Sequence, residues 1–563
     1  MIYHCEDHTC NYWDEGEKLP ERCPQCGRKL LRANEADMTG DDWTALGNTL
    51  WDAEASDKKR MVDCFRKAAY LGSAWGVCNL GICMEQGNGV EADPVQAFWL
   101  YQQAVEMGSL NAVCCLGVCY QYGIGTAPDA EKAAELYCKA AEYGSPRGQM
   151  LLAHAFHDGI GVEADAAEAV HWVRAAAYQR YGEGMHRLGV CYEYGDGVEQ
   201  NWERAVHWFR EAAESGVSAA MADLGYCYEK GCGVEQSWEQ AFSWYRRGAE
   251  CGYPVSMSNL GLCYKRGYGV EQNWQEAVKW YEQGAQCGHL QSMNNLAYCY
   301  ERGEGVEQNE DRALYWYRRG AEAGSDYCMY CLGWNYSNGE GVEQNMTEAI
   351  RWYTAAAEGG NADAMHDLGW LYDHGEGVEQ DMKKAICWYE RAAEQNHPAA
   401  MNSLGECYAM GRGVPRDLET AMEWYRRAAE LGEAMADYNM GWHLEQAGKL
   451  SEAYAHYRKA ADGNDDSAWW ALGRFYENGV VVAQDGKEAR RCYETGEKLG
   501  NVKCKMRLAR CKLLGIGGRR AKKAGLDLCR QALELAKESS EKEDYGYEAE
   551  MNLLRRTIAE NES

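Results

Sequence analysis

Apolar residues along the chain follow the spacing of α-helices. In the segment AAMADLGYCYEKG (219–231), small and apolar residues recur at intervals of three and four, which predicts a helix with one buried face. The segment WEQAFSWYRRGAE (238–250) has the same spacing and predicts a second amphipathic helix. Ser237 is placed to cap the start of this second helix, and Gly252 follows it where a left-handed residue ends the last turn.

This pair of predicted helices recurs along the chain, mostly with a period of 36 residues. A small residue in the middle of each first helix, called the anchor below, marks the period at Gly47, Gly81, Gly117, Ala153, Gly189, Gly225, Gly261, Ala297, Gly333, Gly369, Gly405, Gly441, Gly473 and Ala509. A glycine inside a helix costs about 1 kcal/mol relative to alanine. We therefore expect another helix to pass too closely at the anchors for a larger side chain.

A single helix pair cannot bury its apolar faces, whereas a stack of pairs can. The sequence therefore predicts an all-α fold, a right-handed α-solenoid of about 14 helix-turn-helix repeats with a concave and a convex wall. We expect three parts: a zinc-ribbon-like segment over residues 1–36, the repeat solenoid over 37–540 and a C-terminal capping helix over 541–563.

The repeated motif A-x-x-LG-x-x-Y-x-x-G-x-GV, followed by a second helix that ends in A-A-x-x-G, resembles the Sel1-like repeat, a relative of the tetratricopeptide repeat. The resemblance covers about nine tenths of the chain. It implies a scaffold or adaptor role in signalling and protein assembly, and it names no ligand. The glycine-rich loop itself is not read as a phosphate site, because no strand precedes it.

Cysteines near the N-terminus have the spacing of metal ligands. Cys23 and Cys26 form a CPQC turn, and Cys5 with Cys10 supplies a second pair, with His8 as the alternative to Cys10. The sequence predicts structural Zn²⁺ at these residues, because the segment has little core and metal binding would supply its folding energy. Free thiols without metal are the alternative interpretation.

The chain carries a net charge of −29, which disfavours nucleic acid and anionic membranes and favours basic proteins or peptides as partners. The alternative is that the charge only keeps a long molecule in solution. No apolar run is long enough for a membrane helix, and the first residues lack a signal peptide, so we expect a cytoplasmic protein. Most of the 26 cysteines should then be thiols.

Two residues after the anchor, cysteine recurs in one repeat after another. We interpret this column as core packing, since adjacent helices lie too far apart for a disulfide. Its members are Cys83, Cys119, Cys191, Cys227, Cys263, Cys299, Cys407 and Cys511.

The exposed ridge of the first helix is predicted at positions 219, 222, 223, 226, 229 and 230 and their equivalents. From Tyr226 onward, the residue after the anchor is mostly large and aromatic, and two residues before the anchor asparagine is frequent. We expect these side chains to bind a protein or peptide, with aromatic anchors and with amides that hold its backbone. The candidate residues are Tyr226, Asn259, Asn295, Tyr298, Trp334, Trp370, Asn439 and Trp442. The alternative is that the aromatic side chains only pack between neighbouring first helices.

Residues 501–526 contain nine basic residues and no acid. This segment is either a solvated helix face or a site for an acidic partner, which could be another copy of the chain; nucleic acid is a weaker third choice.

No metalloprotease, α/β-hydrolase or P-loop motif is present, so the first hypothesis is a non-catalytic scaffold that binds a protein segment along the concave groove. The second is a regulatory subunit or effector that docks through its zinc ribbon. The third, a penicillin-binding or β-lactamase-like hydrolase, is implied only by the family resemblance, and the chain lacks a serine-lysine signature.

Overall fold

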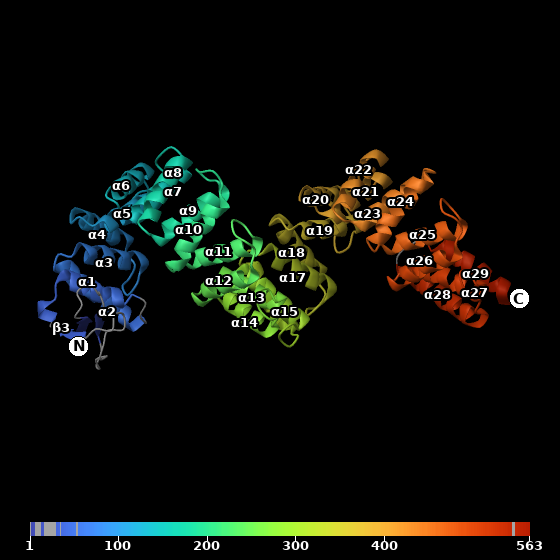
Figure 1. The fold of residues 1–563 in the computed structure, drawn as a ribbon, viewed down its shortest axis with the longest axis horizontal. Coiled ribbons are helices and arrows are strands. Elements are labelled where there is room, and N and C mark those ends of the chain that lie inside the picture. The colour runs from blue at the N-terminus through green and yellow to red at the C-terminus, as the bar shows by residue number, and fades with distance from the viewer. Residues whose placement is uncertain are drawn as a thin grey trace. The chain divides into compact units, whose positions relative to one another are not determined.

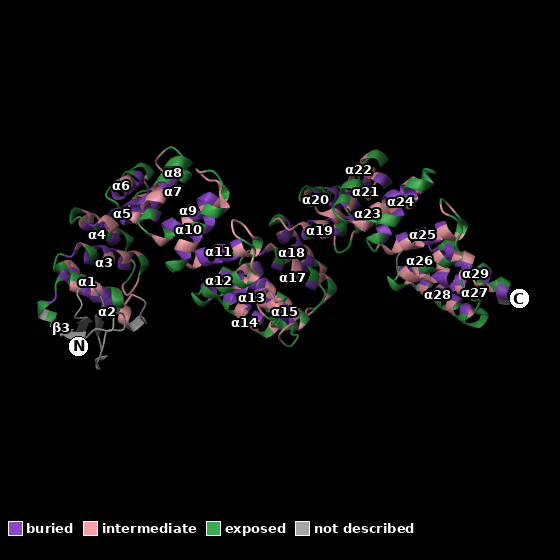
Figure 2. Ribbon diagram, in the orientation of Figure 1, coloured by how far each residue is buried: buried purple, intermediate pink, exposed green. Residues whose placement is uncertain are grey.

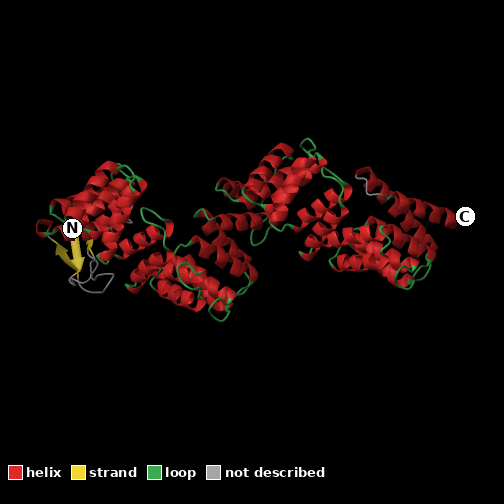
Figure 3. Cartoon of the chain, turned by 90° about the horizontal axis from the view of Figure 1, so that it is seen from above, coloured by secondary structure: helices red, strands yellow, loops and turns green. Residues whose placement is uncertain are grey.

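The computed structural model describes residues 2–5, 13–15, 30–33, 35–51, 55–542 and 547–562. Most of these residues lie in α-helices that alternate between the first and the second helix of a repeat (Figures 1 and 3). In this described part, α1 to α28 form fourteen consecutive pairs, and α29 follows them. The helical repeat architecture predicted from the sequence is therefore confirmed.

The helices belong to two compact units. The first unit, Met1–Ser292 with Glu304–Val306, contains a 3₁₀ turn (Glu35–Asp37) and α1 (Gly40–Thr49), α2 (Ala55–Tyr70), α3 (Ala74–Gln86), α4 (Pro94–Glu106), α5 (Leu110–Tyr122), α6 (Ala130–Glu142), α7 (Pro146–Asp158), α8 (Ala166–Tyr178), α9 (Gly182–Tyr194), α10 (Trp202–Glu214), α11 (Ser218–Lys230), α12 (Trp238–Glu250), α13 (Pro254–Arg266) and α14 (Trp274–Gln286).

The second unit is Met293–Gly303 with Glu307–Ser563. It contains most of α15 (Leu290–Arg302), then α16 (Glu310–Glu322), α17 (Asp326–Asn338), α18 (Met346–Glu358), α19 (Ala362–His374), α20 (Met382–Glu394), α21 (Pro398–Met410), α22 (Leu418–Glu430), α23 (Ala434–Gln446), α24 (Leu450–Asp462), α25 (Asp466–Asn478), α26 (Gly486–Lys498), α27 (Val502–Leu514), α28 (Lys522–Lys542) and α29 (Glu548–Glu562).

Three short strands near the N-terminus form an antiparallel sheet. They are β1 (Ile2–Cys5), β2 (Trp13–Glu15) and β3 (Leu30–Ala33), in the order β2-β1-β3. Ile2 pairs with Glu15 and with Ala33, and Cys5 pairs with Leu30. The fold is therefore helical repeats preceded by a small sheet.

The ends of the helices follow the predicted capping chemistry. The hydroxyl of Ser237 accepts a hydrogen bond from the backbone N–H of Gln240 at 3.3 Å and caps α12. Gly252, two residues beyond α12, has a φ of +84°, which a residue with a side chain rarely adopts. These signals repeat along the chain and explain why nearly every described helix has the same length.

Each anchor glycine receives an aromatic ring from the second helix of its own repeat. A Cβ atom added to Gly225 would stand 2.6 Å from the ring of Tyr245, which is fully buried. The expectation that a close neighbour excludes a side chain at the anchor is confirmed, and the neighbour is a ring. Where the anchor is alanine, the position 20 residues later, which usually carries the ring, holds a smaller residue in two of three repeats: Val173 follows Ala153, and Cys529 follows Ala509.

The buried rings also tie the two helices of a repeat together. The hydroxyl of Tyr245 donates to the Glu229 carboxylate at 2.8 Å. Burial raises the pKa of Tyr245 above its ordinary value, and the negative charge of Glu229 raises it further. The same bond joins Tyr101 to Glu85, Tyr317 to Glu301, Tyr457 to Glu445 and Tyr493 to Glu477. Buried residues therefore lie where the paired helices face each other (Figure 2).

The cysteine column belongs to this core. All eight of its members are buried, and none of them forms a disulfide in the described part of the chain. Burial raises the pKa of Cys83 to about 11 and that of Cys227 to about 12. The interpretation of the column as core packing is confirmed.

Candidate partner-binding face

The aromatic residues that follow the anchors lie half-exposed on the first helices. Tyr226 is 42% exposed, Trp334 37%, Trp370 39% and Trp442 39%. Tyr298 is more buried than these four. The anchors beside them are buried against the rings of the second helices, so the adjacent aromatic residues point away from that contact, toward another face of the first helix. A partner could cover them without any change in the core.

Trp370 forms part of the wall of a cavity of about 250 Å³ in the second unit. Its indole ring stacks on the His374 imidazole, with 4.2 Å between the ring centres. We name this space the tryptophan cavity; its lining is Ser337, Asn338, Met346, Tyr353, Asp367, Trp370, Leu371 and Glu376. A mixed apolar and polar lining of this kind suits a side chain of a bound peptide.

Asn439, one of the asparagines predicted to hold a peptide backbone, is bonded to side chains of the same chain. The Asn439 carboxamide donates to Asn402 Oδ1 at 3.0 Å and to Glu406 Oε1 at 3.2 Å, which joins α23 to α21. Asn259 and Asn295 are half-buried on their helices. Because its donors are already used, Asn439 is less suited to hold a peptide backbone than the sequence suggested.

Other polar pairs bridge neighbouring first helices in the same register. His186 and Asp223 lie 2.6 Å apart, and the Tyr330 hydroxyl donates to Asp367 at 3.2 Å; each pair is separated by 37 residues. One part of the predicted ridge is wrong, because Ala222 is buried. The exposed surface of the first helix is therefore narrower than the sequence indicated.

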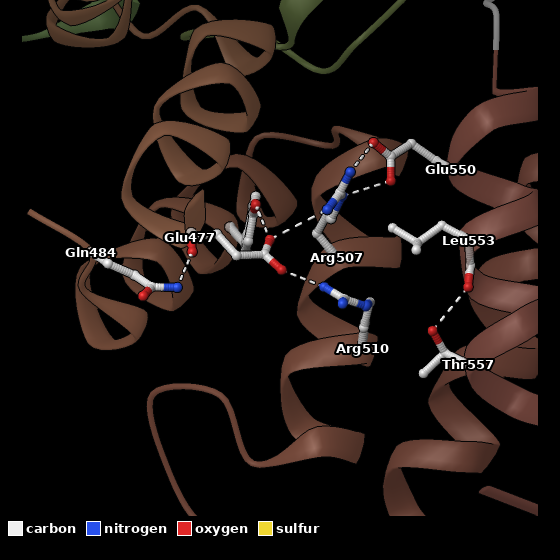
Figure 4. Close-up of polar contacts among 8 residues, drawn as sticks. Glu477, Gln484, Arg507, Arg510, Glu550, Leu553 and Thr557 are labelled. Carbon is white, nitrogen blue, oxygen red and sulfur yellow. Dashed lines mark hydrogen bonds and ion pairs between the residues drawn. The ribbon is translucent and has the colours of Figure 1, made fainter. Parts of the chain in front are cut away.

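Two residues of the basic segment, Arg507 and Arg510, form ion pairs with carboxylates of the same chain. Arg507 on α27 forms two bonds to Glu550 on α29, at 2.6 and 2.7 Å, and lies 3.3 Å from Glu477 (Figure 4). Arg510 pairs with the other oxygen of Glu477. The Glu550 carboxylate is the first of the partners that raise the pKa of Arg507, although burial alone would lower it. The acidic partners of these two residues lie on α25 and α29 of the same chain, so the prediction of a solvated face is wrong at Arg507 and Arg510.

The predicted zinc ligands Cys10, Cys23 and Cys26, and the alternative His8, lie outside the described residues. Cys5 is the last residue of β1. Among the described residues, no group of three metal-ligating side chains comes together. No described helix is long and apolar enough to cross a membrane.

Paired helices with buried rings against small anchors define a solenoid-like repeat protein of the tetratricopeptide type. The chain belongs to the Sel1 repeat family, whose profile matches twelve segments at residues 76–109, 112–145, 146–181, 182–217, 218–253, 254–289, 290–325, 326–361, 362–397, 398–433, 434–465 and 468–501. The pairs α1/α2 and α27/α28 lie outside these segments.

Among solved structures, the chain is similar to c5321, a protective antigen of uropathogenic Escherichia coli that displays an SLR fold. The two are 29% identical over 76% of this chain and 94% of that chain, with a TM-score of 0.53. A Sel1 repeat protein from Oxalobacter formigenes is 32% identical over 43% of this chain and 96% of that chain, with a TM-score of 0.40. A comparison with curated proteins finds no significant match.

Proposed function

We propose that this protein is a non-catalytic scaffold that binds an extended segment of a partner protein along its first helices. The half-exposed aromatic residues after the anchors carry the proposal, because large rings at such positions supply most of the energy of an interface. Proteins built from Sel1 and tetratricopeptide-like repeats are generally interaction scaffolds. The net charge of −29 favours a basic partner.

Packing alone accounts poorly for these rings. A tryptophan that only filled space between repeats would be buried as fully as Tyr389 in the core of the same repeat, yet Trp370 leaves 39% of its surface open. Its position at the tryptophan cavity gives a bound side chain both an aromatic wall and a space to enter.

Replacing Trp370 by alanine is expected to weaken peptide binding at least about tenfold, because a central aromatic anchor contributes about 2 kcal/mol or more. Peptides are first selected from a random displayed library on the full-length protein, and their affinities are then measured by fluorescence polarisation. Trp388→Ala, on the second helix of the same repeat, is the matched control and should leave the affinity unchanged. Equal affinities of the wild-type protein and Trp370→Ala would reject the proposed face.

We also propose that the N-terminal segment binds one structural zinc ion. The pairing of Cys5 with Leu30 supports this, because Cys26 precedes Leu30 by only four residues in the sequence. Cys5, Cys10, Cys23 and Cys26, or His8 in place of Cys10, would then close a tetrahedral site without an open position for catalysis. Docking of a partner through this segment is the second candidate role.

The full-length protein is expected to retain about one equivalent of zinc after dialysis, and the double variant Cys23→Ser/Cys26→Ser is expected to retain almost none. Metal content is measured by inductively coupled plasma mass spectrometry. Cys251→Ser/Cys287→Ser, which removes two exposed thiols from the repeats, should bind zinc like the wild type. Less than about half an equivalent in the wild type would contradict the site.

A further inference from the structure

A second cavity lies in the second unit, one repeat before the tryptophan cavity. It occupies the equivalent place in its own repeat. Its volume is about 290 Å³, and it lies where the end of α15 and the start of α16 meet α17. We name it the acidic cavity; its lining is Glu301, Arg302, Gln308, Glu310, Ala313, Leu314, Asn335 and Glu340.

The two cavities differ in chemistry although they share a place in the repeat. In the next repeat, 36 residues later, Met346 stands at the position of Glu310, and Leu371 stands at the position of Asn335. The lining of the tryptophan cavity is therefore richer in apolar side chains, whereas three carboxylates line the acidic cavity. The repeat architecture does not require these carboxylates, since the next repeat folds without them at two of the three positions.

The charges of the acidic cavity are not balanced. Glu301 accepts the hydroxyl of Tyr317 at 2.6 Å and lies 3.8 Å from Arg302. The carboxylates of Glu310 and Glu340 have neither a hydrogen-bond nor an ion-pair partner within the described ranges. A cation that entered the cavity would therefore meet two uncompensated carboxylates.

A buried amide gives an independent indication of a ligand. Asn335 is only 6% exposed and lines the cavity, and its carboxamide has no hydrogen-bond partner among the side chains and backbone that the structure describes. It occupies the register that holds cysteine in eight other repeats. A ligand that donates to the Asn335 oxygen would give this amide the partner that it lacks within the described part of the chain.

We propose that the acidic cavity binds the guanidinium group of an arginine side chain in the partner peptide, an inference that rests on the proposed scaffold function. Arginine fits better than lysine because its planar fork of five donors can reach two carboxylates and the Asn335 oxygen together. Neighbouring helices lie about 8–10 Å apart, and an extended chain rises about 3.3 Å per residue. The adjacent tryptophan cavity should then receive an apolar side chain about three residues from the arginine.

The test uses peptides selected on the full-length wild-type protein and the double variant Glu310→Gln/Glu340→Gln. We expect the selected peptides to contain an arginine whose replacement by alanine weakens binding to the wild type about tenfold or more. The same replacement should matter less than about threefold on the double variant or on Asn335→Leu, which copies the next repeat. Glu343→Gln/Glu379→Gln, which neutralises two exposed loop carboxylates outside both cavities, is the control and should behave like the wild type.

The outcomes separate this inference from the function on which it rests. Peptides that depend on Trp370 but carry no arginine, or whose arginine contributes equally on the wild type and the double variant, overturn the acidic cavity alone. A selection that yields no peptide, or only peptides that are insensitive to Trp370→Ala, overturns both proposals.

Discussion

Replacing Tyr245 by alanine is expected to lower the local opening free energy of α11 and α12 by about 3–5 kcal/mol, because it removes a fully buried ring and leaves a cavity at Gly225. The Glu229 carboxylate would also lose the phenol that donates to it at 2.8 Å. Native-state hydrogen exchange measures the change, since the stability of a repeat protein is a sum of local terms.

Tyr245→Phe separates the two contributions. It keeps the ring and removes one hydrogen bond, so the loss should be only about 1 kcal/mol. The preceding repeat already has phenylalanine at the equivalent position, Phe209. There burial raises the pKa of Glu193, which has no phenol at that position. A loss in Tyr245→Phe as large as that in Tyr245→Ala would contradict the packing of ring against anchor.

Replacing Arg507 by alanine is expected to destabilise the C-terminal end of the second unit by about 3–5 kcal/mol, because it leaves the buried carboxylates of Glu477 and Glu550 without their shared cation. Glu550 lies on α29, so this helix should separate from α27 first. Faster amide exchange over residues 547–562, with unchanged exchange in α17 to α20, is the expected measurement.

The double variant Arg507→Met/Glu550→Met is the control for the ion pair. It removes both charges together, and the loss should be much smaller than in Arg507→Ala because no uncompensated charge stays buried between these two residues. If Arg507→Ala leaves the exchange of α29 unchanged, the docking of this helix on Arg507 is wrong.

Local features of the fold were predictable from the sequence. The second helix predicted at 238–250 is α12, Trp238–Glu250, and the first predicted at 219–231 begins and ends one residue earlier as α11. These boundaries depend on caps and on periodicity, which are encoded within a few residues. The anchor glycines likewise indicated a close neighbour, although not that the neighbour is a ring 20 residues further on.

Contacts between repeats were harder to predict from the sequence. The bond from Asn439 to Asn402 and the burial of Ala222 depend on how far one first helix is rotated against the next, which a single repeat does not reveal. The pairing of Arg507 with Glu550 joins a repeat to a helix outside the repeat pattern. A signal for the acidic cavity was present in the sequence, since Asn335 interrupts the cysteine column.

The most direct test of the account is the hydrogen-exchange footprint of a selected peptide on the full-length protein. Binding along the first helices predicts slower exchange mainly in α15, α17 and α19. In the second helices, the change should be confined to the N-terminal parts of α16 and α18, whose residues line the two cavities. Protection that falls mainly on the second helices, or no protection at saturating peptide, would contradict it.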